Sequence, residues 1–307
     1  MRTQKLGKSN LEVPVVAVGC MRIGGLEKKA AASFVGKAIE LGANFFDHAD
    51  IYGDTACESI FAGALKDAGT RREDVILQTK CGIIPDRMYD LSKEHIMRSV
   101  DGSLSRLGTD YIDVLLLHRP DALIEPEEVA EAFDALHASG KVRHFGVSNQ
   151  NPGQIRLLQK YVKYPILANQ LQLSITNATM ITQGIHVNID GDTWAVDRDG
   201  GILDFCRLED ITVQPWSPFL YGTFEGVFIG SDKYPALNVS LTAMARKYGI
   251  SETAIAVAWI LRHPAHMQPV IGTMNEGRLA DCVMAADVAL SREDWYELLL
   301  SAGSDLP

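Results

Sequence analysis

The sequence has no long apolar run: none approaches the ~18 residues that a membrane-spanning helix requires. Its first residues, Met1–Lys5, lack the apolar core of a secretory signal peptide. Its five cysteines are scattered and include no C-x-x-C pair, which is typical of reduced thiols rather than of a disulfide framework. These absences predict a soluble protein of the cytoplasm.

The sequence has fewer basic than acidic residues: 29 Lys and Arg and 39 Asp and Glu, which give a net charge of -10. Nucleic acids and anionic membranes bind basic patches, so neither is expected as a partner. No His, Asp or Glu cluster has the spacing of metal ligands, and the acidic stretch 190–199 lacks the D-x-D-x-D-G order of a calcium loop. We therefore expect no metal site, and we expect local groups to bind any phosphate on a ligand.

Glycine-rich nucleotide fingerprints are also missing. Gly24-Gly25 follows the first predicted barrel strand, but no G-x-G-x-x-G is present there, which argues against a Rossmann domain. Gly7-Lys8-Ser9 matches only the end of a P-loop, because the earlier glycine of that motif falls at Arg2 and no buried strand precedes it. We interpret it as the turn of a β-hairpin over residues 3–14.

Strand-like and helix-like segments alternate through the rest of the chain. The strand-like segments begin near residues 15, 45, 75, 113, 144, 166, 211 and 268. The helix-like segments lie at 28–41, 58–68, 93–107, 126–139, 152–160, 201–207, 237–248, 252–263, 276–286 and 291–301. Such alternation indicates parallel βαβ units and, with eight strands, a (β/α)8 TIM barrel. Since no repeat, low-complexity tract or linker interrupts it, we predict one domain over residues 1–307.

Two predicted connections are long for a compact domain: residues 171–200 and 216–236. Both follow strands, so both are expected at the C-terminal face of the barrel, where loops of this length are usually functional. We expect the first to be a solvated loop over a substrate site.

Ionisable residues follow three of the apolar, strand-like runs. Asp47 and Tyr52 come after the second predicted strand, Lys80 after the third and His118 after the fourth. Taken singly, Asp47 could cap a loop and Tyr52 could be an ordinary wall residue. The C-terminal strand ends carry the active site in a (β/α)8 barrel, so the matching positions of all four residues favour a shared site.

This group suits acid catalysis at a carbonyl. Tyrosine titrates near ~10 and is a poor acid at neutral pH. We expect the Lys80 ammonium to lower the pKa of Tyr52, and Asp47 to hold that lysine charged and in place. His118 would then orient a carbonyl oxygen against the phenol. Since no nucleophile or metal cage is evident, the attacking species is expected to be a hydride brought by a cofactor.

The motif Asp47-x-Ala49-x-x-Tyr52-Gly53, with Lys80 and His118 at later strand ends, resembles the tetrad of the aldo-keto reductase family. Further matches follow in chain order: Gly146-Val147-Ser148-Asn149, Asn169-Gln170, Trp216-Ser217-Pro218 and Gly272-Thr273-Met274. The resemblance implies a bacterial-type NADPH-dependent oxidoreductase that transfers hydride to an aldehyde or ketone, with Tyr52 as the proton donor. One departure is His48, where many relatives carry a small hydroxyl residue.

The resemblance also implies a site for NADPH/NADP+. Its residues would be Cys20, Met21, Asp47, Ser148, Asn149, Gln170, Trp216, Ser217, Phe219, Gly222, Gly272, Thr273, Met274, Arg278 and Asp281. Ser148, Asn149 and Gln170 would hold the nicotinamide carboxamide, and Trp216 would stack against the ring. The alternative interpretation is that the three polar residues only cap loops and that Trp216 is an ordinary core residue.

The cofactor phosphates are expected further along the C-terminal face. Three residues would lie along the pyrophosphate, largely through backbone contacts: Ser217, Phe219 and Gly222. Thr273 precedes a predicted helix, whose N-terminus favours anions, and Arg278 would pair with the 2'-phosphate unless it is only a solvated helix residue. Asp281-Cys282 stands where many relatives have a Glu-Asn pair that holds adenine, so the acid is shortened and the amide is lost.

A second interpretation stays open, namely an NADPH-binding sensor or scaffold protein with little turnover, because a fold does not imply a function. An intact tetrad favours the enzyme, whereas a large apolar patch on the barrel exterior would favour a partner protein. For the enzyme, a monomer acting on a small-molecule carbonyl substrate is the simplest expectation.

Overall fold

Eight parallel strands form the central sheet of the computed structural model, which describes residues 1–307. In hydrogen-bonded order they are β11 (Thr212–Trp216), β10 (Ile166–Gln172), β9 (Val142–Ser148), β8 (Ile112–Leu117), β5 (Ile76–Cys81), β4 (Phe45–Asp47), β3 (Ala17–Gly19) and β14 (Val270–Ile271). The two ends of the sheet also meet, because the N–H of Gln268, two residues before β14, donates to the carbonyl of Val213 in β11 at 3.0 Å. The sheet is therefore a nearly closed barrel, and the predicted eight-stranded barrel is confirmed.

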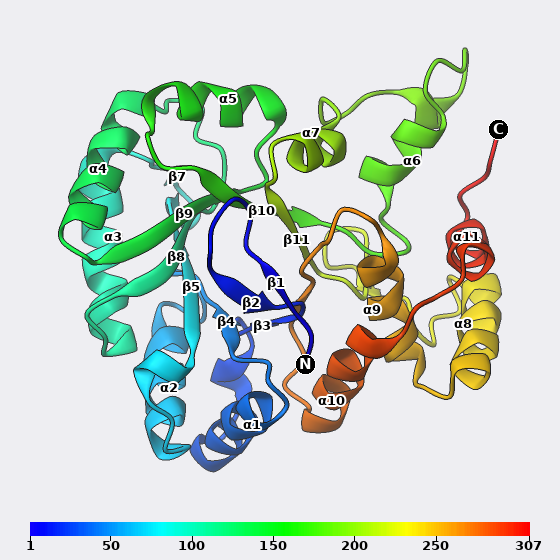
Figure 1. Ribbon diagram of the computed structural model, residues 1–307, viewed down its shortest axis with the longest axis horizontal. Coiled ribbons are helices and arrows are strands. Elements are labelled where there is room, and N and C mark those ends of the chain that lie inside the picture. Colours follow the sequence, from blue (N-terminus) through cyan, green and yellow to red (C-terminus); the bar gives the residue numbers. More distant parts are fainter.

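Helices surround the strands on the outside of the barrel (Figure 1). Those that alternate with strands are α1 (Lys28–Glu40), α2 (Ala56–Asp67), α3 (Lys93–Leu107), α4 (Pro126–Ala138), α5 (Pro152–Tyr161), α7 (Ile202–Leu208), α9 (Glu252–Arg262) and α10 (Glu276–Met284). Three more gather on one side of the molecule: α6 (Thr179–Ile185), α8 (Pro235–Tyr248) and α11 (Arg292–Ser301). No helix combines the length and the apolar character needed to cross a bilayer.

Side chains at the helix ends explain where several of these helices start and stop. In α5, the Asn151 side chain accepts from the N–H of Gln154, and the Gln154 side chain accepts from the N–H of Asn151, at 3.0 and 2.9 Å. Pro152 occupies the first helical position, where a missing N–H costs nothing. Helix α3 begins after the capping side chain of Ser92 and ends at Gly108, whose φ of 62° is left-handed.

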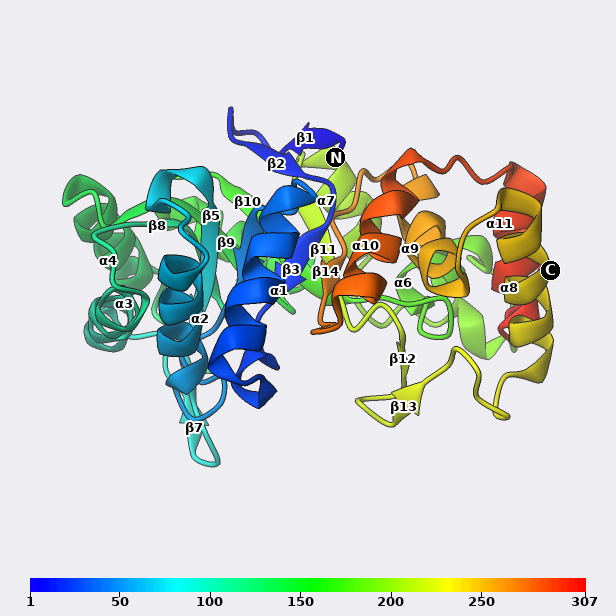
Figure 2. The ribbon, with the colours of Figure 1, turned by 90° about the horizontal axis from the view of Figure 1, so that it is seen from below.

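Antiparallel hairpins lie at both ends of the barrel. They are β1 (Thr3–Lys5) with β2 (Glu12–Pro14), β6 (Ile83–Ile84) with β7 (Met88–Tyr89), and β12 (Leu220–Tyr221) with β13 (Gly226–Val227). The β1–β2 hairpin lies at one end, whereas β7 and the β12–β13 hairpin project from the other (Figure 2). The latter two follow the C-terminal ends of β5 and β11, so this second end is the C-terminal face.

The predicted N-terminal hairpin closes the opposite end of the barrel. Leu6 and Val13 are fully buried and pack with residues of the barrel interior such as Phe45. Gly7 forms the turn with φ 51°, and a Cβ at this position would lie 2.5 Å from the carbonyl oxygen of Leu167. Gly7 therefore serves a tight turn against the barrel floor, as the sequence indicated.

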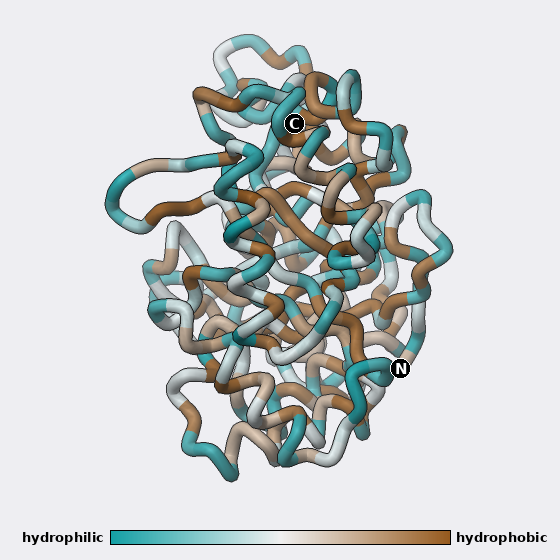
Figure 3. The backbone as a smooth tube through the Cα atoms, turned by 90° about the vertical axis from the view of Figure 1, so that its left-hand side faces the viewer, coloured by the Kyte–Doolittle hydropathy of each residue, from teal (hydrophilic) through white to brown (hydrophobic).

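The hydrophobic core lies mainly between the strands and the surrounding helices. Figure 3 shows hydrophobic segments running through the middle of the molecule and hydrophilic stretches mainly on its outer loops. Phe145 of β9 stacks on Phe133 of α4, with ring centroids 3.9 Å apart, and both side chains are fully buried. Such packing of strands against helices fixes the barrel and therefore the positions of its strand ends.

The interior of the barrel contains buried amides that reach from the floor to the C-terminal end. Gln268 donates to the carbonyl of Pro14 at 2.6 Å and accepts from Gln214 at 2.8 Å. Gln214 and Gln78 donate to each other's side-chain oxygens at 3.1 and 2.9 Å. Gln78 also donates to the carboxylate of Asp47 at 2.6 Å. Because each buried amide has hydrogen-bond partners, this series of glutamine side chains fixes the Asp47 carboxylate in one orientation.

Candidate active site

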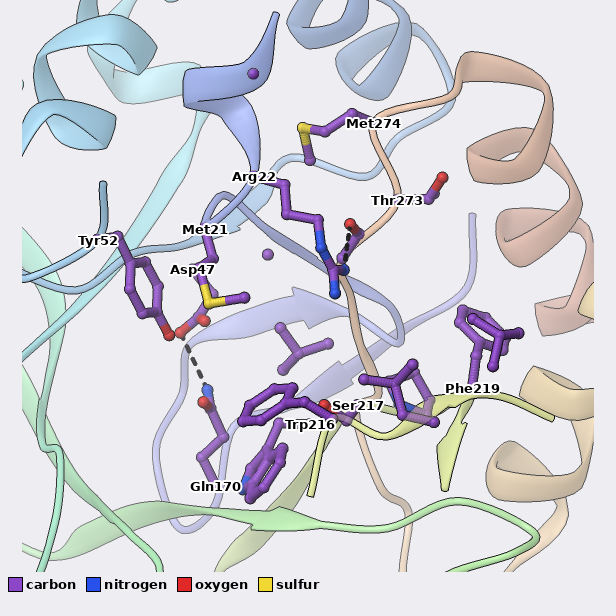
Figure 4. A pocket seen from close by; sticks show the side chains of 18 of the residues that line it. Met21, Arg22, Asp47, Tyr52, Gln170, Trp216, Ser217, Phe219, Thr273 and Met274 are labelled. Carbon is purple, nitrogen blue, oxygen red and sulfur yellow. Dashed lines mark hydrogen bonds between the residues drawn. The ribbon is translucent and has the colours of Figure 1, made fainter. Parts of the chain in front are cut away.

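A cavity of about 960 Å³ opens at the C-terminal face of the barrel. Strand ends and the turns after them supply much of its lining, including Gly19, Asp47, Ser148, Gln170 and Trp216. Figure 4 shows Tyr52, Asp47 and Gln170 grouped at one end, with Thr273 and Met274 across the cavity from them. The cavity is large enough for a small-molecule ligand or an organic cofactor.

The four predicted catalytic residues come together at one end of this cavity. The Lys80 ammonium lies 2.7 Å from Asp47 Oδ2 and 3.1 Å from the Tyr52 hydroxyl, and it also donates to the carbonyl of His48 at 2.8 Å. The rings of Tyr52 and His118 meet edge to face with centroids 6.0 Å apart. His118 lines the cavity, and its side chain makes no hydrogen bond within the chain. Its imidazole is therefore available to a ligand.

Burial and the Lys80 ammonium act on the pKa of Tyr52 in opposite directions. Burial is the largest influence and raises the pKa of the Tyr52 phenol above its ordinary value, although the neighbouring Lys80 ammonium lowers it in part. Burial also acts to lower the pKa of Lys80, but Asp47 and Tyr52 outweigh it and the net pKa is raised. Lys80 thus lowers the pKa of Tyr52 as predicted, but burial, which the sequence did not indicate, outweighs it, and the site holds a neutral phenol beside a charged ammonium.

His118 is held neutral. Burial, the Lys80 ammonium and the Arg119 guanidinium all lower the pKa of its imidazole well below the usual range. A neutral imidazole carries one N–H donor, so His118 can donate a hydrogen bond to a carbonyl oxygen.

The predicted nicotinamide residues form a second hydrogen-bonded group beside the first. The Gln170 side chain donates to Asp47 Oδ1 at 3.0 Å. The Ser148 hydroxyl donates to the Gln170 carbonyl at 2.9 Å and accepts from the Asn149 side chain at 2.7 Å. The Trp216 indole N–H in turn donates to Asn149 Oδ1 at 3.1 Å. All four residues line the cavity, so their remaining polar groups and the indole face can meet one ligand.

The predicted phosphate-binding residues lie across the cavity, where β14 leads into α10. Asn275 caps α10 by accepting from the N–H of Arg278 at 2.9 Å. The Arg278 guanidinium donates to the Thr273 hydroxyl at 3.2 Å, is exposed and forms no ion pair within the chain. Gly272, Thr273, Met274 and Arg278 all line the cavity, as do Met21, Ser217 and Phe219. An unpaired guanidinium beside a helix N-terminus can hold a phosphate.

Three of the predicted cofactor residues lie outside the cavity lining. Cys20 is buried with its thiol directed at the carbonyl of Val18, and burial raises its pKa well above the ordinary value. The carbonyl of Gly222 accepts from the Gln172 side chain at 2.7 Å. Asp281 does not reach the cavity surface either. A ligand in this cavity would therefore meet Met21 rather than Cys20.

Two arginines of the cavity were not among the predicted residues. Arg22 follows Met21 and donates to the carbonyl of Gly272 at 3.1 Å, as Figure 4 shows. Arg119 directly follows His118 and also lines the cavity. Their place beside strand ends was a usable signal, because every residue just after a barrel strand is a candidate for this face.

The two long connections differ in their relation to the cavity. Residues 171–200 contribute nothing to its lining, so the expectation that they cover a substrate site is wrong. Their helix α6 buries Met180 in the main core, and His186 donates to the carbonyl of Asp305 at 3.0 Å, which binds this connection to the C-terminal segment. The connection 216–236 does border the cavity, through Leu220, Phe224, Val227 and Ile229 among others.

The side chain of His48 belongs to the core beneath the site. It is fully buried, its ring meets Phe61 edge to face at 4.5 Å, and neither ring nitrogen has a partner within the chain. Burial, with the Lys80 ammonium, lowers the pKa of His48 to about 3. Only its carbonyl serves the site, by accepting from Lys80.

No group of three or more His, Cys, Asp or Glu side chains is arranged to hold a metal ion.

A buried carboxyl near the site makes stability depend on pH. Burial, and then repulsion by Glu58, raises the pKa of Asp50 to about 7. Between its unfolded pKa of ~4 and about 7, the folded state keeps a proton that the unfolded state releases, so the stability that Asp50 contributes is lost as the pH rises through this window. Asp50→Asn should therefore stabilise the fold by about 1–3 kcal/mol near pH 8 and change little near pH 4.

Urea unfolding at both pH values measures this effect. Asp190→Asn is the matched control, because Asp190 is exposed and makes no hydrogen bond or ion pair. A stabilisation by Asp50→Asn that is the same at both pH values would contradict the assignment.

Comparison with known proteins agrees with this geometry. The profile of the Aldo/keto reductase family matches residues 15–299. The uncharacterized oxidoreductase YcsN of Bacillus subtilis is 36% identical over 287 residues, which cover 90% of this chain and 89% of that protein. The 6-dehydroglucose reductase of Agrobacterium fabrum is 35% identical, with 94% of each chain covered.

Solved structures show the same architecture. The thermostable aldo-keto reductase Tm1743, solved in complex with the inhibitor epalrestat, superposes with a TM-score of 0.78 at 27% identity, covering 99% of this chain and 100% of that one. The Bombyx mori aldo-keto reductase in complex with NADP gives a TM-score of 0.75 at 23% identity, covering 97% and 92%, and shows the fold alone. From its sequence and its barrel, this chain belongs to the aldo/keto reductase family.

Proposed function

We propose that this protein is an NADPH-dependent reductase that transfers a hydride to an aldehyde or ketone, with Tyr52 donating the proton. The observation that carries the proposal is the position of the Lys80 ammonium, which bridges Asp47 Oδ2 and the Tyr52 hydroxyl at 2.7 and 3.1 Å. A phenol placed this way at the end of a cavity, with His118 beside it, is suited to protonate a carbonyl oxygen.

The lining of the cavity fits a nicotinamide dinucleotide. Asn149 and Gln170 offer amide groups, which match the donors and acceptors of a carboxamide. The indole of Trp216 offers a flat face for an aromatic ring. At the far side, Arg278 is an unpaired cation beside the first turn of α10, where a 2'-phosphate would be neutralised.

The bound cofactor would supply a hydride from nicotinamide C4 to the carbonyl carbon. The protein's own groups would complete the reduction at the carbonyl oxygen. The Tyr52 hydroxyl would give its proton to that oxygen, and the neutral His118 would orient the carbonyl by donating a hydrogen bond. The Lys80 ammonium would stabilise the phenolate that remains, and Asp47 would keep Lys80 charged.

Assay of NADPH oxidation with a panel of small aldehydes and ketones tests the proposal. Turnover of any of these carbonyl compounds, with the alcohol as product, is the expected result. Binding of NADPH without reduction of any member of a broad panel would instead favour a sensor or scaffold protein.

The preference for NADPH over NADH gives a separate prediction. Arg278→Ala should weaken NADPH binding about 10-fold, or ~1–2 kcal/mol, because one exposed charge-assisted contact is lost. NADH binding should barely change, since NADH has no 2'-phosphate. Fluorescence titration of both cofactors measures this, with Arg292→Ala as a control for an exposed arginine outside the cavity. Equal weakening of the two cofactors would show that Arg278 does not bind the 2'-phosphate.

A further inference from the structure

The cavity is cationic although the protein is acidic. The chain carries a net charge of -10, but the charged residues of the cavity lining are Arg22, Arg119, Arg278 and one carboxylate, Asp47. That carboxylate is already neutralised, because Asp47 accepts from the buried Lys80 ammonium at 2.7 Å. The three guanidinium groups therefore give the cavity an excess of positive charge, which suits anionic ligands.

The three arginines divide between two parts of the cavity. Arg22 donates to the carbonyl of Gly272 and Arg278 to the hydroxyl of Thr273, so both lie near the β14–α10 junction. This is the part of the cavity in which the cofactor phosphates are proposed to bind.

Arg119 lies in the other part, next to the candidate catalytic residues. It directly follows His118, whose pKa its positive charge helps to lower. Its guanidinium carbon lies 5.9 Å from the centre of the Trp216 ring. A ligand group bound by Arg119 would therefore lie close to a carbonyl held by Tyr52 and His118, and away from the proposed phosphate site.

Nothing within the chain neutralises Arg119. It is half-buried and makes neither an ion pair nor a hydrogen bond, whereas other half-buried arginines do, such as Arg72 with Asp113 at 2.7 Å and Arg106 with Glu58 at 2.8 Å. Its planar fork of donors matches a carboxylate in bidentate geometry.

We propose that Arg119 binds a carboxylate of the substrate, so that the preferred substrates are aldehydes or ketones that also carry a carboxylate group. This inference rests on the proposed function and names the substrate class of the same site. The cavity lining includes Ile51, Ile83 and Phe224, and the Phe224 ring stacks on Trp216, the same ring that Arg119 approaches. The part of the substrate between carbonyl and carboxylate should therefore be compact and apolar.

Matched pairs of a carboxylic acid and its methyl ester test directly whether the enzyme prefers substrates with a carboxylate charge. The probes are succinic semialdehyde and 4-carboxybenzaldehyde, each with its ester, and glyceraldehyde as a neutral hydroxylated aldehyde. For the wild-type protein we expect kcat/KM to be about 10–100-fold higher for an acid than for its ester. Arg119→Leu should remove this difference by raising KM for the acids, while kcat changes less than about 3-fold. Arg119→Lys should retain part of the preference.

Two controls separate this role from a structural one. Arg246→Leu removes the same charge from α8, which contributes no residue to the cavity, and should leave all parameters unchanged. NADPH affinity should be equal in the wild-type protein and in Arg119→Leu.

Several outcomes would overturn the inference while leaving the proposed function intact. These are equal wild-type activity on acid and ester, equal losses on both in Arg119→Leu, a matching loss on glyceraldehyde, or weaker NADPH binding in that variant. Reduction of none of the probes or of the wider panel would instead overturn the proposed function, and this inference with it.

Discussion

Tyr52→Phe should lower the turnover of a good carbonyl substrate about 10²–10⁴-fold, the usual contribution of general acid catalysis. The substitution removes one hydroxyl, which lies 3.1 Å from the Lys80 ammonium, and keeps the ring that meets His118 edge to face. Lys80 keeps its contacts with Asp47 and with the carbonyl of His48, so the fold and the cavity should survive. After the substitution, no phenol remains to give a proton to the developing alkoxide.

Cofactor binding must be measured alongside turnover for this result to identify the acid. NADPH affinity, from fluorescence titration, should stay nearly unchanged, because the hydroxyl acts in the transition state rather than in ground-state binding. Tyr161→Phe removes a hydroxyl from α5, outside the cavity, and serves as the control. Retention of most of the activity in Tyr52→Phe would require another proton donor.

The barrel could be predicted from the sequence because its signals are local and repeated. Most apolar strands are followed by a long helix-like segment, and several of these helices have end signals, such as Asn151 and Gln154 around Pro152 at the start of α5. Helix α6 was missed because it has only 7 residues and no end signal, since Ala178 at its N-cap provides no side-chain hydrogen bond. The β6–β7 and β12–β13 hairpins were missed because their strands have only two residues each.

The grouping of Asp47, Tyr52, Lys80 and His118 could also be predicted, since strand ends of one barrel converge whatever the loops do. That the pKa of Tyr52 is raised overall could not be predicted, because the shift depends on how deeply the phenol is buried. Burial raises the pKa by more than Lys80 lowers it. The inward direction of Cys20 has the same origin, because its burial depends on the final packing of the turn after β3. The sequence alone predicts where a strand ends, but it does not predict how deeply each side chain at that end is buried.

Lys80→Met should both stop catalysis and weaken the fold. The Lys80 side chain is fully buried and its ammonium has three oxygen partners, so its loss leaves Asp47 without a positive partner. Removing one member of a buried ion pair typically costs about 3–5 kcal/mol of the free energy of unfolding. Because Asp47 keeps its hydrogen bonds from Gln78 and Gln170, we expect a loss at the lower end of that range, measured by urea unfolding.

The effect on turnover should match that of Tyr52→Phe, because Lys80 is the neighbour that lowers the pKa of the Tyr52 phenol most. Without it the phenol becomes a weaker acid, and turnover should fall by about 10²–10⁴-fold at a temperature where the variant is fully folded. The double variant Tyr52→Phe/Lys80→Met decides how the two residues act. If Lys80 acts through Tyr52, the double variant should be no slower than the slower single variant. Losses that multiply would instead mean that Lys80 contributes to the reaction independently of the phenol, for example by polarising the carbonyl itself.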